Sequence, residues 1–261
     1  MTQSPRRFTL CVAHGVIAIL CCFASPSYAR DLLAIQKEGV LRLATEGSTP
    51  PFNYFRNGQL TGFDVQIGDA IAARLHLRAE WVTAPFDTLL IGLQQGRYDL
   101  IVMGQAITPE REAAVDFSVP YVCSGGVIVA LAGGPRHRAD LAGKTVGVQV
   151  GTTYLAALSQ VGNIRIVRTF QRDTDALQNL IAHRVDAWVS DRLTALYLSH
   201  QNPSLNLQIG DMLFKERDGI VIAKGEPALR DAVNASIGAV LLDGTYAAIA
   251  HRHFGEDVRC E

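Results

Sequence analysis

The sequence lacks an excess of basic residues. Its 261 residues include 24 Lys and Arg against 25 Asp and Glu, which gives a formal net charge of −1 at pH 7. Nucleic-acid-binding surfaces depend on clustered positive charge, and this composition supplies no surplus for one. We therefore expect no nucleic-acid partner.

Long hydrophobic runs are absent beyond the N-terminus. Arg6 and Arg7 precede an apolar stretch over residues 8–24, and Ser27-Tyr28-Ala29 places small residues where a signal peptidase recognises them. This pattern predicts a signal peptide over residues 1–29 and Sec-dependent export of a soluble protein to the periplasm. No later run reaches the roughly 18 apolar residues that a membrane-spanning helix requires.

Cysteine is scarce outside the predicted signal peptide. Three of the five cysteines lie within it, and Cys123 and Cys260 remain. An even pair in an oxidising compartment predicts a disulfide between these two residues. The alternative is two buried free thiols.

Motifs for nucleophilic or metal chemistry are also missing. The sequence contains no Gly-x-Ser-x-Gly elbow. His251 and His253 are two residues apart, so a helix would direct them to different sides. We expect neither a metal nor another cofactor.

A helix, a turn and a buried strand occur twice in the same arrangement. The matching residues are Leu90, Leu93, Arg97 and Asp99 in the first unit and Leu177, Leu180, Arg184 and Asp186 in the second. Because each unit is a helix that leads into a strand of a sheet, the repeat suggests two α/β lobes with similar wiring. A chance echo of a common unit explains the repeat equally well.

The order of predicted elements divides the chain into two lobes, and the chain passes from one lobe to the other twice. We assign residues 30–122 with 219–261 to the first lobe and residues 127–213 to the second. Pro120, Gly125 and Gly126 interrupt the pattern between them. The fold class is therefore α/β, with each lobe a mixed sheet flanked by helices and a two-stranded hinge near residues 118–126 and 214–218.

Arg111 occupies an unusual position for a cation. It follows Thr108, a predicted N-cap, and Pro109, a residue typical of the first helical position. The helix dipole disfavours a positive charge at this end by about 0.3–1 kcal/mol. Either Glu110 or Glu112 compensates Arg111 at the surface, or Arg111 and the free N–H groups of the first turn bind a carboxylate.

Six motifs stand in the order and spacing of family 3 periplasmic solute-binding proteins, which this chain resembles over nearly all of its predicted mature length. These motifs are Glu46-Gly47-Ser48-Thr49-Pro50-Pro51-Phe52, Gly62-Phe63-Asp64, Phe86-Asp87-Thr88-Leu89, Ile107-Thr108-Pro109-Glu110-Arg111, Phe117-Ser118-Val119-Pro120-Tyr121 and Val148-Gln149-Val150-Gly151-Thr152-Thr153. The family comprises the polar amino-acid receptors of ABC importers. The resemblance implies the type II periplasmic binding fold, an amino-acid ligand, an inner-membrane ABC permease as partner and a monomeric receptor.

The resemblance implies a carboxylate site that both lobes complete. Arg111 matches the arginine that clamps the ligand α-carboxylate, and Thr153 matches the residue that completes this site from the second lobe. Thr152 and Thr153 are equally suited to cap the helix that follows them. Ala106 stands where the family usually has Ser or Thr, so a hydroxyl contact is lost there.

The resemblance also implies contacts to the ligand ammonium group. Asp191 matches the carboxylate that pairs with it, although an N-cap role is the simpler explanation from the sequence alone. Gly104 matches a position whose backbone carbonyl accepts a hydrogen bond from the same group.

Three further positions concern the ligand side chain. Phe86 matches an aromatic residue that stacks on it, and Thr49 stands where many receptors place a second aromatic. Glu46 matches an acidic position that reaches a distal positive group, or it is a solvated carboxylate at a strand end. The resulting preference for a polar or basic amino acid is weak.

Enzymes of the same fold offer the main alternative function. Periplasmic cyclohexadienyl dehydratases, which act on prephenate or arogenate, share these motifs, and Glu216 is a conceivable catalytic acid. This chain has Val150-Gly151-Thr152 where those dehydratases have a Gly-Gly-Thr stretch. A ligand-sensing module is a third alternative, but such modules normally carry a membrane segment or a second catalytic domain. We therefore expect a receptor and not an enzyme.

Overall fold

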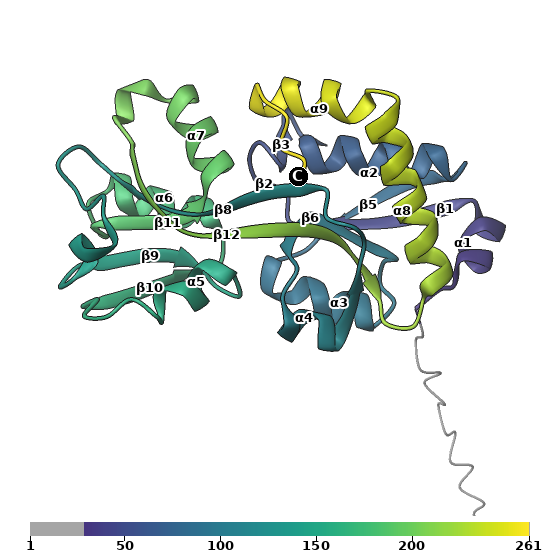
Figure 1. Cartoon of the computed structure of the whole chain (residues 1–261), viewed down its shortest axis with the longest axis horizontal. Helices are drawn as coiled ribbons and strands as arrows, with labels where there is room; N and C mark the ends of the chain where they lie inside the picture. Colours follow the sequence, from purple (N-terminus) through teal and green to yellow (C-terminus); the bar gives the residue numbers. More distant parts are fainter. Residues whose placement is uncertain (1–28, 261) are drawn as a thin grey trace, which may run out of the picture.

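A continuous mixed sheet of nine strands runs along the length of the molecule (Figure 1). The structure is a computed structural model, and it describes residues 29–260. The predicted signal peptide lies outside the described residues except for Ala29. The strands of this sheet are β1 (Val40–Thr45), β5 (Arg78–Thr83), β6 (Leu100–Ala106), β7 (Val115–Phe117), β8 (Val122–Ala130), β9 (Thr145–Gln149), β10 (Ile166–Phe170), β11 (Ala187–Asp191) and β12 (Gln208–Ala223). Their order is β10-β9-β11-β8-β12-β6-β1-β5, and β7 pairs with β12.

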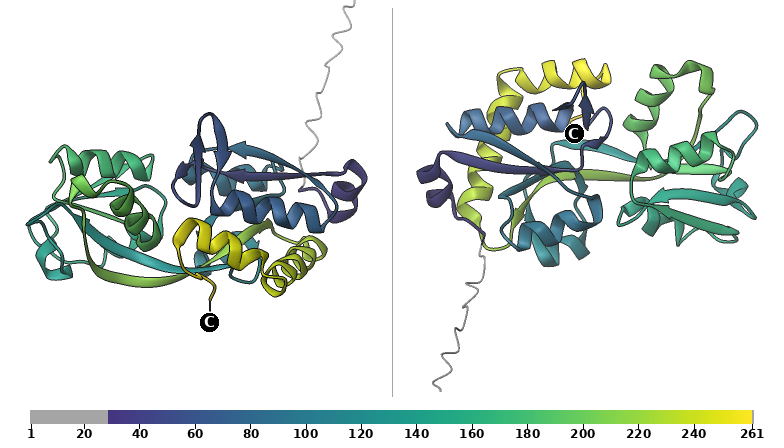
Figure 2. Two further views of the ribbon diagram at one scale, coloured as in Figure 1. Left: turned by 90° about the horizontal axis from the view of Figure 1, so that it is seen from above. Right: turned by 180° about the vertical axis from the view of Figure 1, so that it is seen from behind.

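Helices cover both faces of the sheet at each end, as the views in Figure 2 show. The α-helices are α1 (Leu32–Glu38), α2 (Phe63–Arg74), α3 (Leu89–Gln94), α4 (Pro109–Ala114), α5 (Thr153–Leu158), α6 (Asp173–Ile181), α7 (Arg192–Gln201), α8 (Pro227–Leu242) and α9 (Thr245–Phe254). Short 3-10 turns are η1 (Phe86–Thr88), η2 (Arg138–Leu141) and η3 (Pro203–Leu205), and β2 (Ser48–Thr49), β3 (Asn53–Arg56) and β4 (Gln59–Thr61) form a small separate sheet. The predicted α/β class is confirmed.

The repeated sequence unit has a repeated structure. Asp99 Oδ2 accepts the backbone N–H of Arg42 at 2.8 Å, and Asp186 Oδ2 accepts that of Thr145 at 2.7 Å. Asp99 immediately precedes β6, which pairs in parallel with β1, the strand that contains Arg42. Asp186 immediately precedes β11, which pairs in parallel with β9, the strand that contains Thr145. The same residue type therefore makes the same backbone contact in both units.

Each end of the sheet has its own hydrophobic core. At one end, α2, α8 and α9 pack over β1 and β6 around Phe63, Leu43 and Tyr246. At the other, α6 and α7 pack on β11 around Trp188, and α5 packs on the opposite face around Val148. Leu193 of α7 belongs to the first core although its helix belongs to the second end, so the two ends are in contact.

The chain crosses between the two ends as β8 and β12, which pair in antiparallel fashion from Val122 opposite Asp218 to Ala130 opposite Gln208. Strand β12 includes residues 214–218, which we assigned to the hinge, and begins earlier, at Gln208, because Gln208, Ile209 and Met212 also pair with β8. Gly125 and Gly126 lie inside β8 and not in a turn. A Cβ at these positions would lie 2.2 Å from the Phe214 carbonyl oxygen and 2.6 Å from the Phe214 ring, so glycine permits the close approach of β12.

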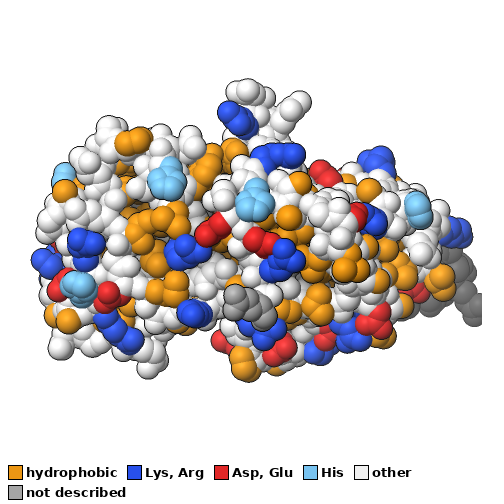
Figure 3. Space-filling model, turned by 45° about the horizontal axis from the view of Figure 1, so that its top comes forward, with side chains coloured by type: hydrophobic (Ala, Val, Ile, Leu, Met, Phe, Trp, Pro, Cys, Tyr) orange, Lys and Arg blue, Asp and Glu red, His pale blue; other side chains and the backbone are white. Residues whose placement is uncertain are grey.

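Within residues 29–260, no single helix is long and apolar enough to cross a membrane. Helices α8 and α9 together satisfy the length and composition for such a span, but they bend by 77° at the break between them. Basic, acidic and hydrophobic side chains are interspersed on the face drawn in Figure 3, in keeping with the small net charge.

A disulfide joins Cys123 of β8 to Cys260 near the C-terminus. The backbone N–H of Cys123 also donates to the Val258 carbonyl at 2.9 Å. The C-terminal segment is thereby fixed to the start of a strand that crosses between the two ends of the molecule.

We predict that Cys123→Ser and Cys260→Ser lower the thermal unfolding temperature equally, because each removes the same cross-link from a long loop. A native disulfide of this kind contributes about 2–4 kcal/mol. Thermal unfolding with and without reductant measures the effect, and the double variant serves as control because it should be no less stable than either single variant. Alkylation of both cysteines in unfolded protein that has never been reduced would contradict the prediction.

Candidate functional site

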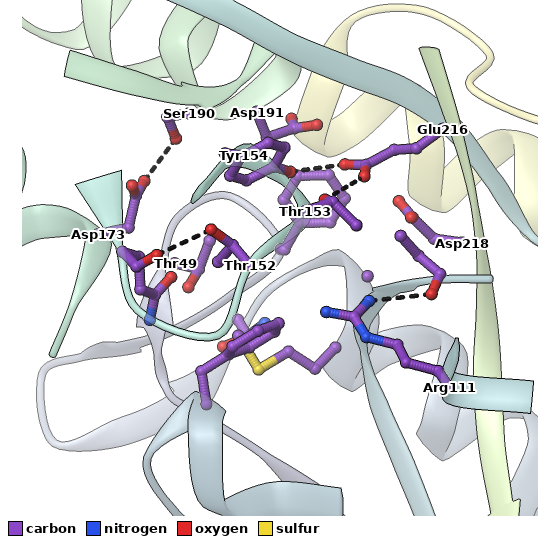
Figure 4. Close-up of a pocket in the computed structure, with 17 residues that line it drawn as sticks. Thr49, Arg111, Thr152, Thr153, Tyr154, Asp173, Ser190, Asp191, Glu216 and Asp218 are labelled. Atoms are coloured by element: carbon purple, nitrogen blue, oxygen red, sulfur yellow. Dashed lines mark hydrogen bonds between the residues drawn. The ribbon is translucent and has the colours of Figure 1, made fainter. Parts of the chain in front are cut away.

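A pocket lies between the two ends of the molecule, where several strands reach their carboxyl ends (Figure 4). Ligands of α/β proteins bind at such edges because side chains and helix starts converge there. The lining residues are Thr49, Phe52, Asn53, Phe86, Met103, Gly104, Ala106, Arg111, Gln149, Thr152, Thr153, Tyr154, Asp173, Ser190, Asp191, Glu216 and Asp218. Eight of the nine residues that we predicted to bind ligand are among them, and Glu46 lies directly behind.

Arg111 enters the pocket from the first turn of α4. The hydroxyl of Thr108 accepts the backbone N–H of Arg111 at 3.2 Å and caps the helix as predicted, and Pro109 is the first helical residue. This cap fixes the helix start at the end of β6. The local sequence thus directs a guanidinium group into the pocket.

The Arg111 guanidinium contacts both sides of the pocket. Its Nη1 donates to the Ala106 carbonyl at 2.9 Å, and its Nη2 donates to the Gly151 carbonyl, on the loop after β9, at 3.1 Å. Its Cζ lies 5.8 Å from the centroid of the Phe86 ring. No ion pair among the described residues includes Arg111, so the alternative of pairing with Glu110 or Glu112 is not realised. Burial lowers the pKa of Arg111, and the negative charges of Glu216 and Asp218 oppose this shift.

The loop after β9 presents Thr152 and Thr153 at the start of α5. Thr152 is the N-cap, because its hydroxyl accepts the N–H of Leu155 at 3.3 Å. Thr153 does not cap the helix with its side chain. Its hydroxyl donates to Glu216 Oε2 at 2.7 Å instead.

Asp191 ends β11 and is the N-cap of α7. Its Oδ1 accepts the backbone N–H groups of Leu193 at 2.7 Å and Thr194 at 3.1 Å, so the capping role is present. The side chain still lines the pocket although only 6% of the residue is exposed. Burial raises the pKa of Asp191, and hydrogen bonds to the carboxylate oppose the shift.

Gly104 is held by a buried hydrogen-bond network beneath the pocket. Its backbone φ of +49° lies in the left-handed region that favours glycine. Its N–H donates to Tyr121 Oη at 2.9 Å, and Tyr121 Oη donates to Asp64 Oδ1 at 2.7 Å. Asn53 completes the network through its amide, which donates to Asp64 Oδ2 at 2.9 Å. Burial raises the pKa of Asp64 to about 6 despite these two donors.

The side of the pocket opposite Arg111 is acidic and polar, as Figure 4 shows for Asp173 and Thr49. Asp173 accepts the indole N–H of Trp188 at 2.8 Å and the hydroxyl of Ser190 at 2.6 Å, and burial raises its pKa to about 7. Gln149 lies near the same side.

Glu46 stands one layer behind this side of the pocket. Its carboxylate accepts from Thr49 Oγ1 at 3.0 Å and from Gln149 Nε2 at 2.8 Å. Burial raises the pKa of Glu46, and these hydrogen bonds oppose the shift. Glu46 is therefore neither a solvated strand-end carboxylate nor a residue of the pocket wall.

Strand β12 contributes two carboxyl groups on the side of the pocket where Arg111 lies (Figure 4). Glu216 accepts the hydroxyls of Thr153 and Tyr154, each at 2.7 Å, and burial raises its pKa to about 6. Asp218 lies two residues further along the strand and is 2% exposed.

Our sequence reasoning missed several lining residues, above all Gln149, Asp173, Ser190 and Asp218. Gln149 ends β9, Ser190 stands beside Asp191 at the end of β11, and Asp173 begins α6 shortly after β10. The rule that ligands bind at strand carboxyl ends could have found these three. Asp218 lies in a charged run, Lys215-Glu216-Arg217-Asp218, that has the composition of a solvated surface segment.

Several contacts join the two sides across the pocket, so the structure is closed. Besides the Arg111–Gly151 bond, Gln149 reaches Glu46, Gln171 Nε2 donates to Asp87 Oδ1 at 2.7 Å, and Arg192 pairs with Glu256 at 2.9 Å. These bonds add to the links that β8, β12 and the packing of Leu193 make between the two ends. A ligand in the pocket would therefore touch both sides at once.

Comparison with known proteins identifies the relatives of this chain. The L-cystine-binding protein TcyJ of Escherichia coli is 32% identical over 248 residues, which cover 93% of each protein. A solved ancestral arginine-binding protein bound to arginine has a TM-score of 0.80 and 37% identity, and the match covers 83% of this chain and 99% of that one. A solved ancestral amino acid-binding protein, described as a precursor of cyclohexadienyl dehydratase, has a TM-score of 0.79 and 34% identity over 84% of this chain and 97% of its own.

The family model for bacterial extracellular solute-binding proteins, family 3, matches residues 41–256. This match extends from β1 to the end of α9 and contains every pocket residue. The chain belongs to the bacterial extracellular solute-binding proteins, family 3.

Proposed function

We propose that this chain captures a cationic L-amino acid in the periplasm and delivers it to an inner-membrane ABC permease. The observation that carries the proposal is the charge of the pocket, whose wall holds four carboxyl groups and one guanidinium group. A zwitterion with a neutral side chain leaves that excess uncompensated, whereas a ligand with an additional positive charge reduces it. L-arginine is the ligand with which we would test the proposal.

The geometry suggests one orientation for the ligand. The α-carboxylate meets Arg111, whose planar guanidinium can offer two parallel N–H donors, and the start of α5 adds backbone N–H groups. The α-ammonium meets Asp191 and the Gly104 carbonyl. The cationic side chain then extends toward Asp173 and Gln149, where Figure 4 places an acidic side chain opposite Arg111.

Closure couples the two lobes to the ligand. We assign residues 30–122 with 219–261 to one lobe, residues 127–213 to the other, and the hinge to residues 118–126 and 214–218. Arg111 and Phe86 belong to the first lobe, and Thr153 and Asp191 to the second. A ligand that contacts both groups stabilises the closed state by interactions that the open state lacks.

The names of the relatives support a transport role. TcyJ is named as a cystine-binding protein, and a Haemophilus influenzae relative 29% identical over 256 residues is named as a probable amino-acid ABC transporter-binding protein. Export through the predicted signal peptide, a permease partner and a monomeric receptor complete the proposal.

We predict that Arg111→Ala weakens L-arginine binding at least about 30-fold, because removing one member of a buried charge pair costs about 2 kcal/mol or more. Arg111→Lys keeps the charge but loses the paired donors, so its affinity should be intermediate. Isothermal titration calorimetry measures both effects. Arg78→Ala, an exposed arginine on β5, is the matched control, and equal affinity of Arg111→Ala and this control would refute the carboxylate site.

We predict that Asp173→Asn lowers the affinity for L-arginine more than the affinity for L-glutamine. The ratio of the two affinities should fall about tenfold, because only arginine carries the extra charge that Asp173 would face. The ratio is measured because loss of the Trp188 and Ser190 contacts affects both ligands alike. Asp175→Asn, an exposed residue in the same helix turn, is the control. An equal loss for the two ligands would remove Asp173 from the specificity site.

A dehydratase is the second candidate function, favoured by the structural similarity to a precursor of cyclohexadienyl dehydratase and by the raised pKa of Glu216. Glu216 has a structural explanation, because it accepts hydroxyls from Thr153 and Tyr154 and joins the hinge strand to α5. We predict no formation of phenylpyruvate when the protein is incubated with prephenate, as followed by absorbance. Turnover that Glu216→Gln abolishes would reverse this assignment.

A further inference from the structure

Asp218 is the least satisfied carboxyl group of the pocket. It lies in β12 opposite Ala106 of β6. Gly104 lines the pocket, and a Cβ built on it would be 3.7 Å from Asp218 Oδ2. The Asp218 carboxyl group therefore lies close to the Gly104 backbone. The residue is 2% exposed, and its Oδ1 is buried without a hydrogen-bond partner among the described residues.

The other carboxyl groups near the pocket each accept two hydrogen bonds from the protein. Asp191 accepts from two backbone amides, Glu216 from two hydroxyls, Asp173 from an indole and a hydroxyl, and Asp64 from an amide and a phenol. Such donors stabilise the ionised form. Within residues 29–260, no comparable donor reaches the Asp218 side chain.

The charged groups that face Asp218 come from four other positions. Glu216 lies on the same strand, Asp191 at the end of β11, Asp64 on α2 and Arg111 on α4. The hydroxyls of Tyr121 and Tyr154 lie nearby, and both are themselves close to carboxyl groups. Burial and the three acidic neighbours raise the pKa of Asp218 well above its ordinary value, and only Arg111 opposes the shift.

The position of Asp218 also matters for the ligand. It shares the side of the pocket with Arg111 (Figure 4), where the proposed function places the ligand carboxylate. An ionised Asp218 would repel that carboxylate in a partly dry cavity, whereas a neutral one can donate its O–H to it. Ala106, opposite Asp218, has no donor in its side chain, so Asp218 is the residue of this strand pair that can supply one.

We propose that Asp218 contacts the ligand as a neutral carboxylic acid, donating its O–H to the bound carboxylate, so that capture of one ligand draws one proton from solvent onto Asp218. This inference rests on the proposed function of the pocket. The proposal requires Asp218 to be ionised at neutral pH when the pocket is open to solvent. Closure then favours the protonated form, because burial and three acidic neighbours raise the pKa of Asp218. Binding is therefore linked to proton uptake at this residue, which by itself makes affinity fall as pH rises, by up to tenfold per unit.

Calorimetric titration with L-arginine at pH 7, in two buffers that differ in ionisation enthalpy, counts the protons exchanged per ligand bound. Because Asp173 and Glu216 also titrate near neutrality, the decisive quantity is the difference between wild type and Asp218→Asn. We expect wild type to take up about one proton more than Asp218→Asn, and the variant, which keeps a donor at this position, to retain binding. Asp231→Asn, an exposed residue of α8, should exchange protons as wild type does.

Different results separate the two proposals. Equal proton counts in wild type and Asp218→Asn, with binding intact, would overturn the role of Asp218 while leaving the receptor function in place. Loss of binding in Asp218→Asn together with no proton uptake in wild type would show an ionised Asp218 that accepts from the ligand, and this also overturns the inference. An absence of binding heat with L-arginine and every other amino acid would refute the proposed function itself.

Discussion

The antiparallel pairing of β8 and β12 is the constraint on which the rest of the structure depends. Both crossings of the chain are made by these strands, so the two cores are held apart yet remain in one hydrogen-bonded sheet. The approach is close enough that Gly125 and Gly126 cannot carry side chains without displacing Phe214. Because β12 continues past the crossing to pair with β6, its residues Glu216 and Asp218 are placed in the pocket by the sheet itself.

The pocket concentrates buried carboxyl groups that a stable core would avoid. Each buried charge costs free energy unless donors compensate it, and here hydroxyls, amides and an indole provide most of the compensation. What remains is an excess of negative charge beside a single guanidinium group. Buried charges without full compensation are common in binding sites, where the uncompensated groups lower the stability of the protein but can interact with a ligand.

Local signals predicted the parts of the site that local sequence controls. Thr108 and Pro109 specify a helix start, so the place of Arg111 in the first helical turn was predictable. The helix start left open whether Arg111 lies at the surface or in a site, and the resemblance favoured the site. The paired roles of Asp99 and Asp186 were visible as a spacing repeat. Asp173 and Gln149 each stand at an element boundary, where a binding residue can be expected, but their position beside one another depends on the pairing of β9 with β10 and β11, which no single segment encodes. Asp218 was missed because its charged neighbours have the pattern of exposed residues, and its burial results from the pairing of β12 with both β8 and β6.

The bond between Arg111 and the Gly151 carbonyl joins the two sides of the pocket through a residue that also faces the ligand. Arg111 uses two of its five N–H donors for the Ala106 and Gly151 carbonyls, so three remain for a ligand carboxylate. One guanidinium can therefore hold the two sides together and bind the ligand at the same time. A change that reorients this side chain would then disturb closure and affinity together.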